Sequence, residues 1–231
     1  MIVDSDSDPF ADEHGPSSPT ETSTLLPDYA TEVDVPLPSS PPSYILTERP
    51  RQPRIYTFAS RSNTSMLLLP SRDVDPTLTP IYNISVTLNL NPFVPLSYVT
   101  TVRRGRDESG ELVGEFELGV MHSRATLKLN NSATRMSTVL KKSGHSPRKF
   151  TWDCAGVALR WDCRTTLDDG SPMCICSDVD SHQIASFVPP PPDPPQPPPA
   201  ATLTVFPDGH ELFDHILISA LVIDRKITLS F

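Results

Sequence analysis

The sequence predicts a mainly β protein: twelve antiparallel strands that close into a barrel around a central hydrophobic C-terminal helix, preceded by a disordered N-terminal tail. Three observations lead to this fold class. Short runs of alternating or β-branched residues begin at Arg54 and are separated by turn formers. The segment Leu212–Ile223 is apolar on nearly all sides if it is helical. Residues 1–50 have a single Phe and no apolar periodicity.

The strands are predicted from runs of a length typical of single strands. In SYVTTVRR (97–104) and ALRWDCR (158–164) apolar and polar residues alternate, as expected for strands with one face in water. Turn formers such as 106–110 and 168–171 predict antiparallel hairpins. The predicted strands are 54–60, 65–70, 81–88, 97–104, 112–118, 124–130, 137–142, 148–153, 157–164, 173–178, 184–188 and 202–206.

A helix is predicted over residues 207–226, after the last strand. Asp208 and Glu211, three residues apart, match a capping box at its start. The charges also suit the helix dipole, with an acid near the first turn and bases near the last: Asp214, Arg225 and Lys226. A helix that is apolar almost all round has to be enclosed. We therefore expect the sheet to close around it as a barrel.

Charge and proline divide the chain into a tail (1–50), a barrel domain (51–226) and a C-terminal extension (227–231). Nine acidic and no basic residues lie in 1–40, so the formal charge of −9 belongs to the tail and the remainder is neutral. Such a charge balance excludes a nucleic-acid binder with a basic field. The proline-rich segment 189–199 predicts an exposed polyproline II loop between two strands.

The sequence predicts an intracellular, cytoplasmic protein. Residues 1–8 are acidic and unlike a secretory signal, and Leu212–Ile223 is shorter than the ~20 residues that span a bilayer. In that compartment we expect reduced thiols rather than disulfides. The four cysteines are predicted to be small apolar core residues rather than zinc ligands: Cys154, Cys163, Cys174 and Cys176.

Several runs resemble, in the same order, a family of proteins from basidiomycete fungi. These are PSYILT (42–47), YTFAS (56–60), MLLLP (66–70), LRWDCRTTLDDGSPMCIC (159–176), ASFVP (185–189) and TLTVFPDGHELFDHILISALVI (202–223). Over 42–226 the chain is thus similar to the DUF6593 family. The resemblance implies membership of the tubby-like group, which includes phospholipid scramblases and LURP-one-related plant proteins. That group has a twelve-stranded barrel around a hydrophobic C-terminal helix, the architecture predicted above.

The tail contains a PPxY motif at Pro41, Pro42 and Tyr44. In such motifs a pre-extended proline segment and a Tyr ring bind the aromatic groove of a WW domain. We therefore predict a WW-domain partner, such as a ubiquitin ligase. The alternative is a proline-rich linker that runs into the first strand.

Basic residues at strand ends form a second predicted site, the basic patch: Arg103, Arg104, Arg106, Lys141 and Lys142. If neighbouring strands bring them together, they can receive a phosphoinositide head group or a membrane surface, as the tubby-like resemblance also implies. The alternative is that they are solvated strand ends that keep the sheet edges from associating.

No catalytic, metal or cofactor site is predicted. His210 and His215 are five residues apart instead of the four of a zinc-protease helix, and Asp168 and Asp169 fit a hairpin turn. The sequence therefore predicts a non-enzymatic binding module that recruits a WW-domain partner. Two alternatives remain: a peripheral phosphoinositide- or phospholipid-binding protein, and a scramblase-like or other enzymatic role.

Overall fold

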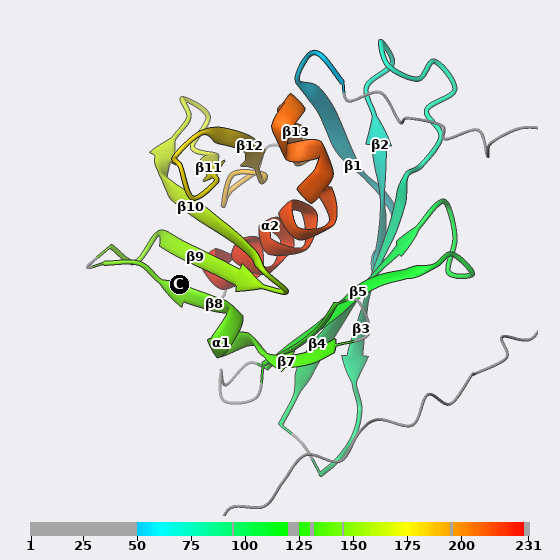
Figure 1. Cartoon of the computed structure of the whole chain (residues 1–231). Coiled ribbons are helices and arrows are strands. Elements are labelled where there is room, and N and C mark those ends of the chain that lie inside the picture. Colours follow the sequence, from blue (N-terminus) through cyan, green and yellow to red (C-terminus); the bar gives the residue numbers. More distant parts are fainter. Residues whose placement is uncertain are drawn as a thin grey trace, which may run out of the picture. The chain divides into compact units, whose positions relative to one another are not determined.

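The computed structural model of the chain describes residues 50–93, 95–119, 125–129, 132–144, 146–194 and 196–228. Thirteen strands in these ranges form one antiparallel sheet (Figure 1). They are β1 (Arg54–Ser62), β2 (Ser65–Pro70), β3 (Tyr82–Asn89), β4 (Ser97–Arg104), β5 (Leu112–Gly119), β6 (Thr126–Leu129), β7 (Ser132–Arg135), β8 (Leu140–Lys142), β9 (Lys149–Cys154), β10 (Val157–Thr166), β11 (Pro172–Ser177), β12 (Gln183–Val188) and β13 (Thr202–Val205).

The strand order shows how the two halves of the chain meet. It is β7-β6-β5-β4-β3-β2-β1-β13-β12-β11-β10-β9-β8. Each strand pairs with its sequence neighbours, except that β7 and β8 do not pair with each other, and β13 also pairs with β1. This arrangement joins the first seven strands to the last six through the β1–β13 pair, in which Tyr56 lies opposite Leu203. The loop 189–199 connects β12 to β13, as predicted, although Pro189 and Pro191 are buried.

The predicted count of twelve strands and the closed barrel are both wrong. The sheet is open, with β7 and β8 as its edge strands. Between them the chain forms one helical turn, α1 (Met136–Val139), which contacts β7, β8 and β9 where a closing strand pair would have to form. In this turn Met136 and Val139 are buried three residues apart, a helical spacing in a segment predicted as strand.

The C-terminal segment is helical, as predicted, but begins differently. A 3₁₀ turn, η2 (Pro207–Leu212), leads into α2 (Phe213–Thr228). The residue before η2 is Phe206 and no side chain caps it, so the predicted capping box is wrong. The predicted dipole charges are confirmed, because an acid lies in the first turn of α2 and bases in its last: Asp214, Arg225 and Lys226. The helix also includes residues 227 and 228 of the predicted C-terminal extension.

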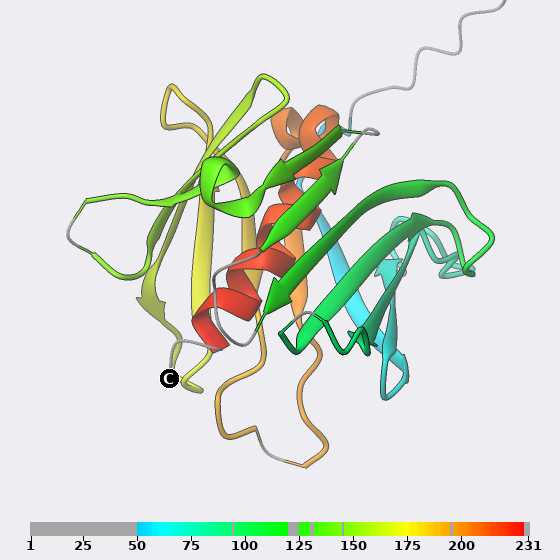
Figure 2. The same cartoon turned by 90° about the horizontal axis from the view of Figure 1, so that it is seen from below.

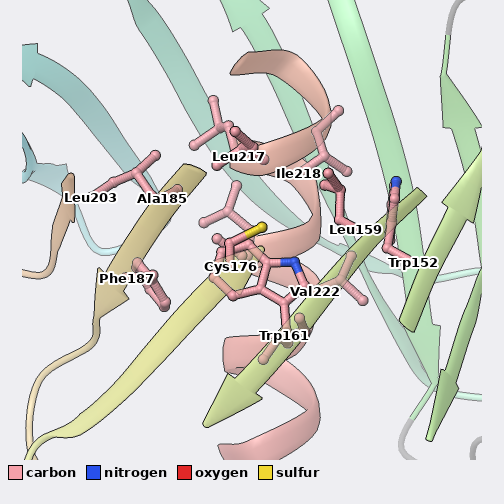
Figure 3. Packing of buried hydrophobic residues seen from close by; sticks show 14 of the residues in the cluster. Trp152, Leu159, Trp161, Cys176, Ala185, Phe187, Leu203, Leu217, Ile218 and Val222 are labelled. Carbon is pink, nitrogen blue, oxygen red and sulfur yellow. The ribbon is translucent and has the colours of Figure 1, made fainter. Parts of the chain in front are cut away.

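The sheet curves around α2, whose residues His215–Ile223 are all buried. Figure 2 shows the helix between the two halves of the sheet. Leu217, Ile218 and Val222 pack beside Trp161 of β10 and Cys176 of β11 (Figure 3). The predicted core cysteines are confirmed as free and buried: Cys154, Cys163, Cys174 and Cys176. In the part of the chain that the structure describes, none of the helices has the length and hydropathy of a membrane span.

Candidate functional site

A cavity of about 920 Å³ lies between the sheet and the C-terminal end of α2. Its wall is formed by apolar side chains from β1, β2, β3, β5 and β12, which project from the concave face of the sheet: Phe58, Met66, Ile84, Phe116, Leu118 and Phe187. Leu221 of α2 lines the opposite side. Because this much apolar surface faces open space inside the domain, the cavity suits an apolar occupant.

The mouth of the cavity has two apolar borders. One is the pair Leu88 and Tyr98, which lie opposite each other at the ends of β3 and β4 and are partly exposed. The other is the proline-rich loop, through Pro190, Pro198 and Pro199. Figure 2 shows this loop, in orange-yellow below β12 and β13, projecting at the end toward which α2 runs. The proline-rich segment is therefore part of a cavity rather than only a spacer.

Polar groups reach the cavity from the last turns of α2. Asp224 and Arg225 both line it. Burial raises the pKa of the Asp224 carboxyl, and the neighbouring charge of Arg225 opposes the shift only in part. Within the described ranges, the Asp224 carboxyl makes no hydrogen bond or ion pair with another side chain. A half-desolvated acceptor is thus available to whatever fills the cavity.

Arg104, from the predicted basic patch, lies at the other end of α2. Its Nη2 donates to Oδ2 of Asp214 at 2.7 Å, and its Nη1 donates to Oη of Tyr82 at 3.0 Å. The Tyr82 hydroxyl in turn donates to Oδ1 of Asp214. Arg104 also lies 3.4 Å from Glu111. The guanidinium therefore joins β3, β4 and the first turn of α2, which gives it a structural role.

The other residues of the basic patch are spread over the domain. Arg103 donates to the Gly110 carbonyl at 3.0 Å, within the β4–β5 connection that also contains Arg106. Lys141 and Lys142 lie on the edge strand β8. Burial, with a contribution from the positive charge of Lys142, lowers the pKa of Lys226, so Lys142 lies within electrostatic range of the last turn of α2.

The structure therefore does not bring the basic patch together. Arg104 contacts Asp214 in the first turn of α2, whereas Lys142 lies within electrostatic range of Lys226 in the last turn. Twelve helical steps of 1.5 Å separate these two positions along the axis, about 18 Å in all. Arg103, Arg104 and Arg106 form one group and Lys141 and Lys142 another, near opposite ends of the helix.

Two other clusters have structural explanations. In the β11–β12 turn, ligand atoms of Asp178, Asp180 and His182 lie within 4.8 Å of one another. The Asp178 carboxylate accepts a hydrogen bond from the His182 amide at 2.8 Å, so it stabilises the turn. His215 accepts a hydrogen bond from the indole of Trp152 at 3.4 Å, while the ring of His210 packs against Phe213. Burial lowers the pKa of both histidines.

The predicted PPxY motif, Pro41, Pro42 and Tyr44, lies outside the described residues. The cavity was not predicted. A sequence signal for it existed in Asp224, an acid near the end of an apolar helix, where the dipole disfavours negative charge.

Comparison with known protein families places the domain. The family model for DUF6593 matches residues 60–228. The chain belongs to DUF6593, a family of unknown function. The DUF6593 match begins in β1 and ends with the last residue of α2, so it contains nearly all of the cavity wall. No curated protein and no solved structure matches the chain.

Proposed function

We propose that this DUF6593 domain is a non-enzymatic binding module that holds an elongated apolar molecule in the cavity at the end of α2. The observation that carries the proposal is the cavity itself, about 920 Å³ and lined by buried aromatic and aliphatic side chains. Small-molecule sites usually measure about 300–1,000 Å³ and are mostly apolar. A ligand that covers this apolar lining removes it from water, which favours binding.

The polar end of the cavity narrows the ligand class. A carboxyl that is desolvated without a hydrogen-bond partner is unfavourable, and a ligand that donates a hydrogen bond removes that cost. Asp224 lies half-buried at the cavity wall, and its carboxyl has no side-chain hydrogen-bond partner among the described residues. The proposed ligand is therefore a lipid-like molecule with a hydroxyl or amine at one end, such as a long-chain alcohol.

Two further parts of the proposal concern the wider family and the tail. We also propose that the domain belongs to the tubby-like group of basidiomycete proteins; the sequence resemblance and an antiparallel sheet that curves around a hydrophobic helix support this. The PPxY motif at Pro41, Pro42 and Tyr44 remains a proposed ligand for a WW domain. If this motif binds a WW domain, we expect Tyr44→Ala to lose a WW-domain protein that the natural chain retains in pull-downs.

The cavity proposal is tested by filling the cavity. Val86 of β3 lines it, and the next residue, Thr87, lies on the opposite, exposed face of the strand. Val86→Trp is expected to abolish binding of a pyrene-labelled long-chain alcohol, measured by fluorescence, whereas Thr87→Trp is expected to bind like the natural sequence. Equal binding by both variants would show that the alcohol does not occupy this cavity.

A further inference from the structure

The β3–β4 loop exposes an apolar surface at the mouth of the cavity. Phe93 is 91% exposed, Leu90 79% and Leu96 51%. The whole segment 89–97 (NLNPFVPLS) contains no charged residue. In Figure 1 this hairpin, drawn in blue-green, projects beyond the other strands at the lower edge of the view. Large apolar side chains that remain in water on a protruding loop need a partner to explain them.

The base of this loop is held in a defined conformation. The Asn91 amide donates to the Asn89 side chain at 3.1 Å, and the Phe93 amide donates to the Asn91 side chain at 3.0 Å. The Asn89 side chain itself donates to Glu117 at 2.8 Å. Pro92 and Pro95 have no amide donor. Of the described loop residues, Asn91 and Phe93 thus have satisfied amides and Pro92 and Pro95 have none to satisfy, which lowers the cost of moving the loop into an apolar phase.

The apolar surface of the loop continues into the cavity. Leu88 and Tyr98, the strand residues that flank the loop, are partly exposed and also line the cavity wall. Arg225 lies on the cavity wall at the same end of the domain. A cation beside an apolar loop favours contact with a surface that has anionic head groups over an apolar interior.

We propose that the β3–β4 loop docks this domain on the surface of a lipid bilayer through Leu90, Phe93 and Leu96, with the cavity mouth facing the lipid. The partner is a bilayer because the docking surface is the uncharged tip of one short loop, whereas each side of a stable protein interface draws on about 20–30 residues. The statement that the cavity mouth faces the lipid rests on the proposed function, whereas docking by the loop does not depend on it. The docking surface lies at the end of α2 opposite Arg104.

Sedimentation of the full chain with phosphatidylcholine vesicles containing phosphatidylserine tests the proposal. Phe93→Ser is expected to weaken vesicle binding about tenfold, because the transfer of one aromatic side chain into lipid is lost. Val179→Ser is the control, since Val179 is 55% exposed in the β11–β12 turn, away from the loop. It is expected to bind vesicles like the natural chain. Both residues are exposed, so neither substitution should affect folding.

Three results would overturn the proposal: no vesicle binding by the natural chain, equal binding by Phe93→Ser, or binding that is lost only with Arg104→Glu. A natural chain that dimerises in light scattering, ignores vesicles and becomes monomeric with Phe93→Ser would show that the loop contacts protein instead. Val86→Trp separates the two proposals. If it loses the labelled alcohol but still sediments with vesicles, docking stands independently of the cavity; if the natural chain sediments without binding alcohol, only the cavity proposal fails.

Discussion

The indole of Trp161 on β10 donates a hydrogen bond of 3.1 Å to the hydroxyl of Ser219, in the fully buried middle of α2. The Ser219 hydroxyl in turn donates a hydrogen bond of 3.1 Å to the Ile216 carbonyl. A directional bond in this largely apolar part of the interface helps to fix how far α2 slides and rotates within the sheet, since apolar contacts alone have no direction.

Ser219→Ala is expected to destabilise the domain by about 1–3 kcal/mol, because it leaves the Trp161 N–H buried without an acceptor. Urea unfolding measures the change. As a control, Ser219→Ala is also made in a chain that carries Trp161→Phe. Because that chain has no indole N–H, Ser219→Ala should lower its free energy of unfolding by less. An equal penalty in both backgrounds would mean that the two residues are not coupled.

Alkaline pH is expected to weaken the domain through Tyr82. Burial, the hydrogen bond to Asp214 and the charge of Asp214 raise the pKa of Tyr82 above its ordinary 10.0. Above pH 10 the unfolded state loses this proton first, so the free energy of unfolding falls as pH rises toward the folded-state pKa. Tyr82→Phe is expected to cost about 1 kcal/mol at pH 7 and to flatten the decline above pH 10. Burial also raises the pKa of Tyr56, so the free energy of unfolding of Tyr82→Phe should still fall slightly with pH.

Local patterning predicted most of this fold. Strands such as β2 and β4 have the predicted bounds because their ends coincide with prolines, charges and turns. Prediction from local patterns failed where contacts between segments distant in sequence determine the secondary structure. β7, SATR, has no large apolar residue and is a strand only because it pairs with β6. The open edge between β7 and β8 depends on the turn at α1, which period-two alternation does not distinguish from a strand.

The candidate site was harder to predict because it depends on register. Arg104 and Lys142 carry the same charge in similar strand-end positions, yet they lie near opposite ends of α2. The cavity needs β1, β3, β5 and β12 to meet around one helix end, and no local pattern encodes that meeting. The uncharged run at 90–96 separates two predicted strands, but nothing in the local pattern marked it as an interaction surface.

Substitution of two closely packed glycines, Gly209 and Gly114, is expected to destabilise the domain to different degrees. A Cβ on Gly209 would lie 2.3 Å from the backbone carbonyl of Ile184, whereas one on Gly114 would lie 2.5 Å from the movable side-chain end of Ile218. Gly114→Ala is expected to cost about 1–3 kcal/mol and Gly209→Ala more, since backbone cannot give way as a side chain does. Thermal unfolding of both variants measures the order. A reversed order would show that the β5–α2 contact is the more rigid.

Asp224 is expected to reduce stability while it serves ligand binding. Burial raises its pKa above that of the unfolded chain. Its contribution is therefore most favourable below the unfolded-state pKa and is lost as pH rises through the folded-state pKa. Asp224→Leu should raise the free energy of unfolding at pH 7 by about 1 kcal/mol and remove this pH dependence.

The same variant should bind the labelled alcohol more weakly, since the acceptor for its hydroxyl is gone. Unfolding at pH 4 and pH 7, with alcohol titrations at pH 7, measures both effects. A variant that is less stable and binds the alcohol unchanged would contradict the role given to this carboxyl.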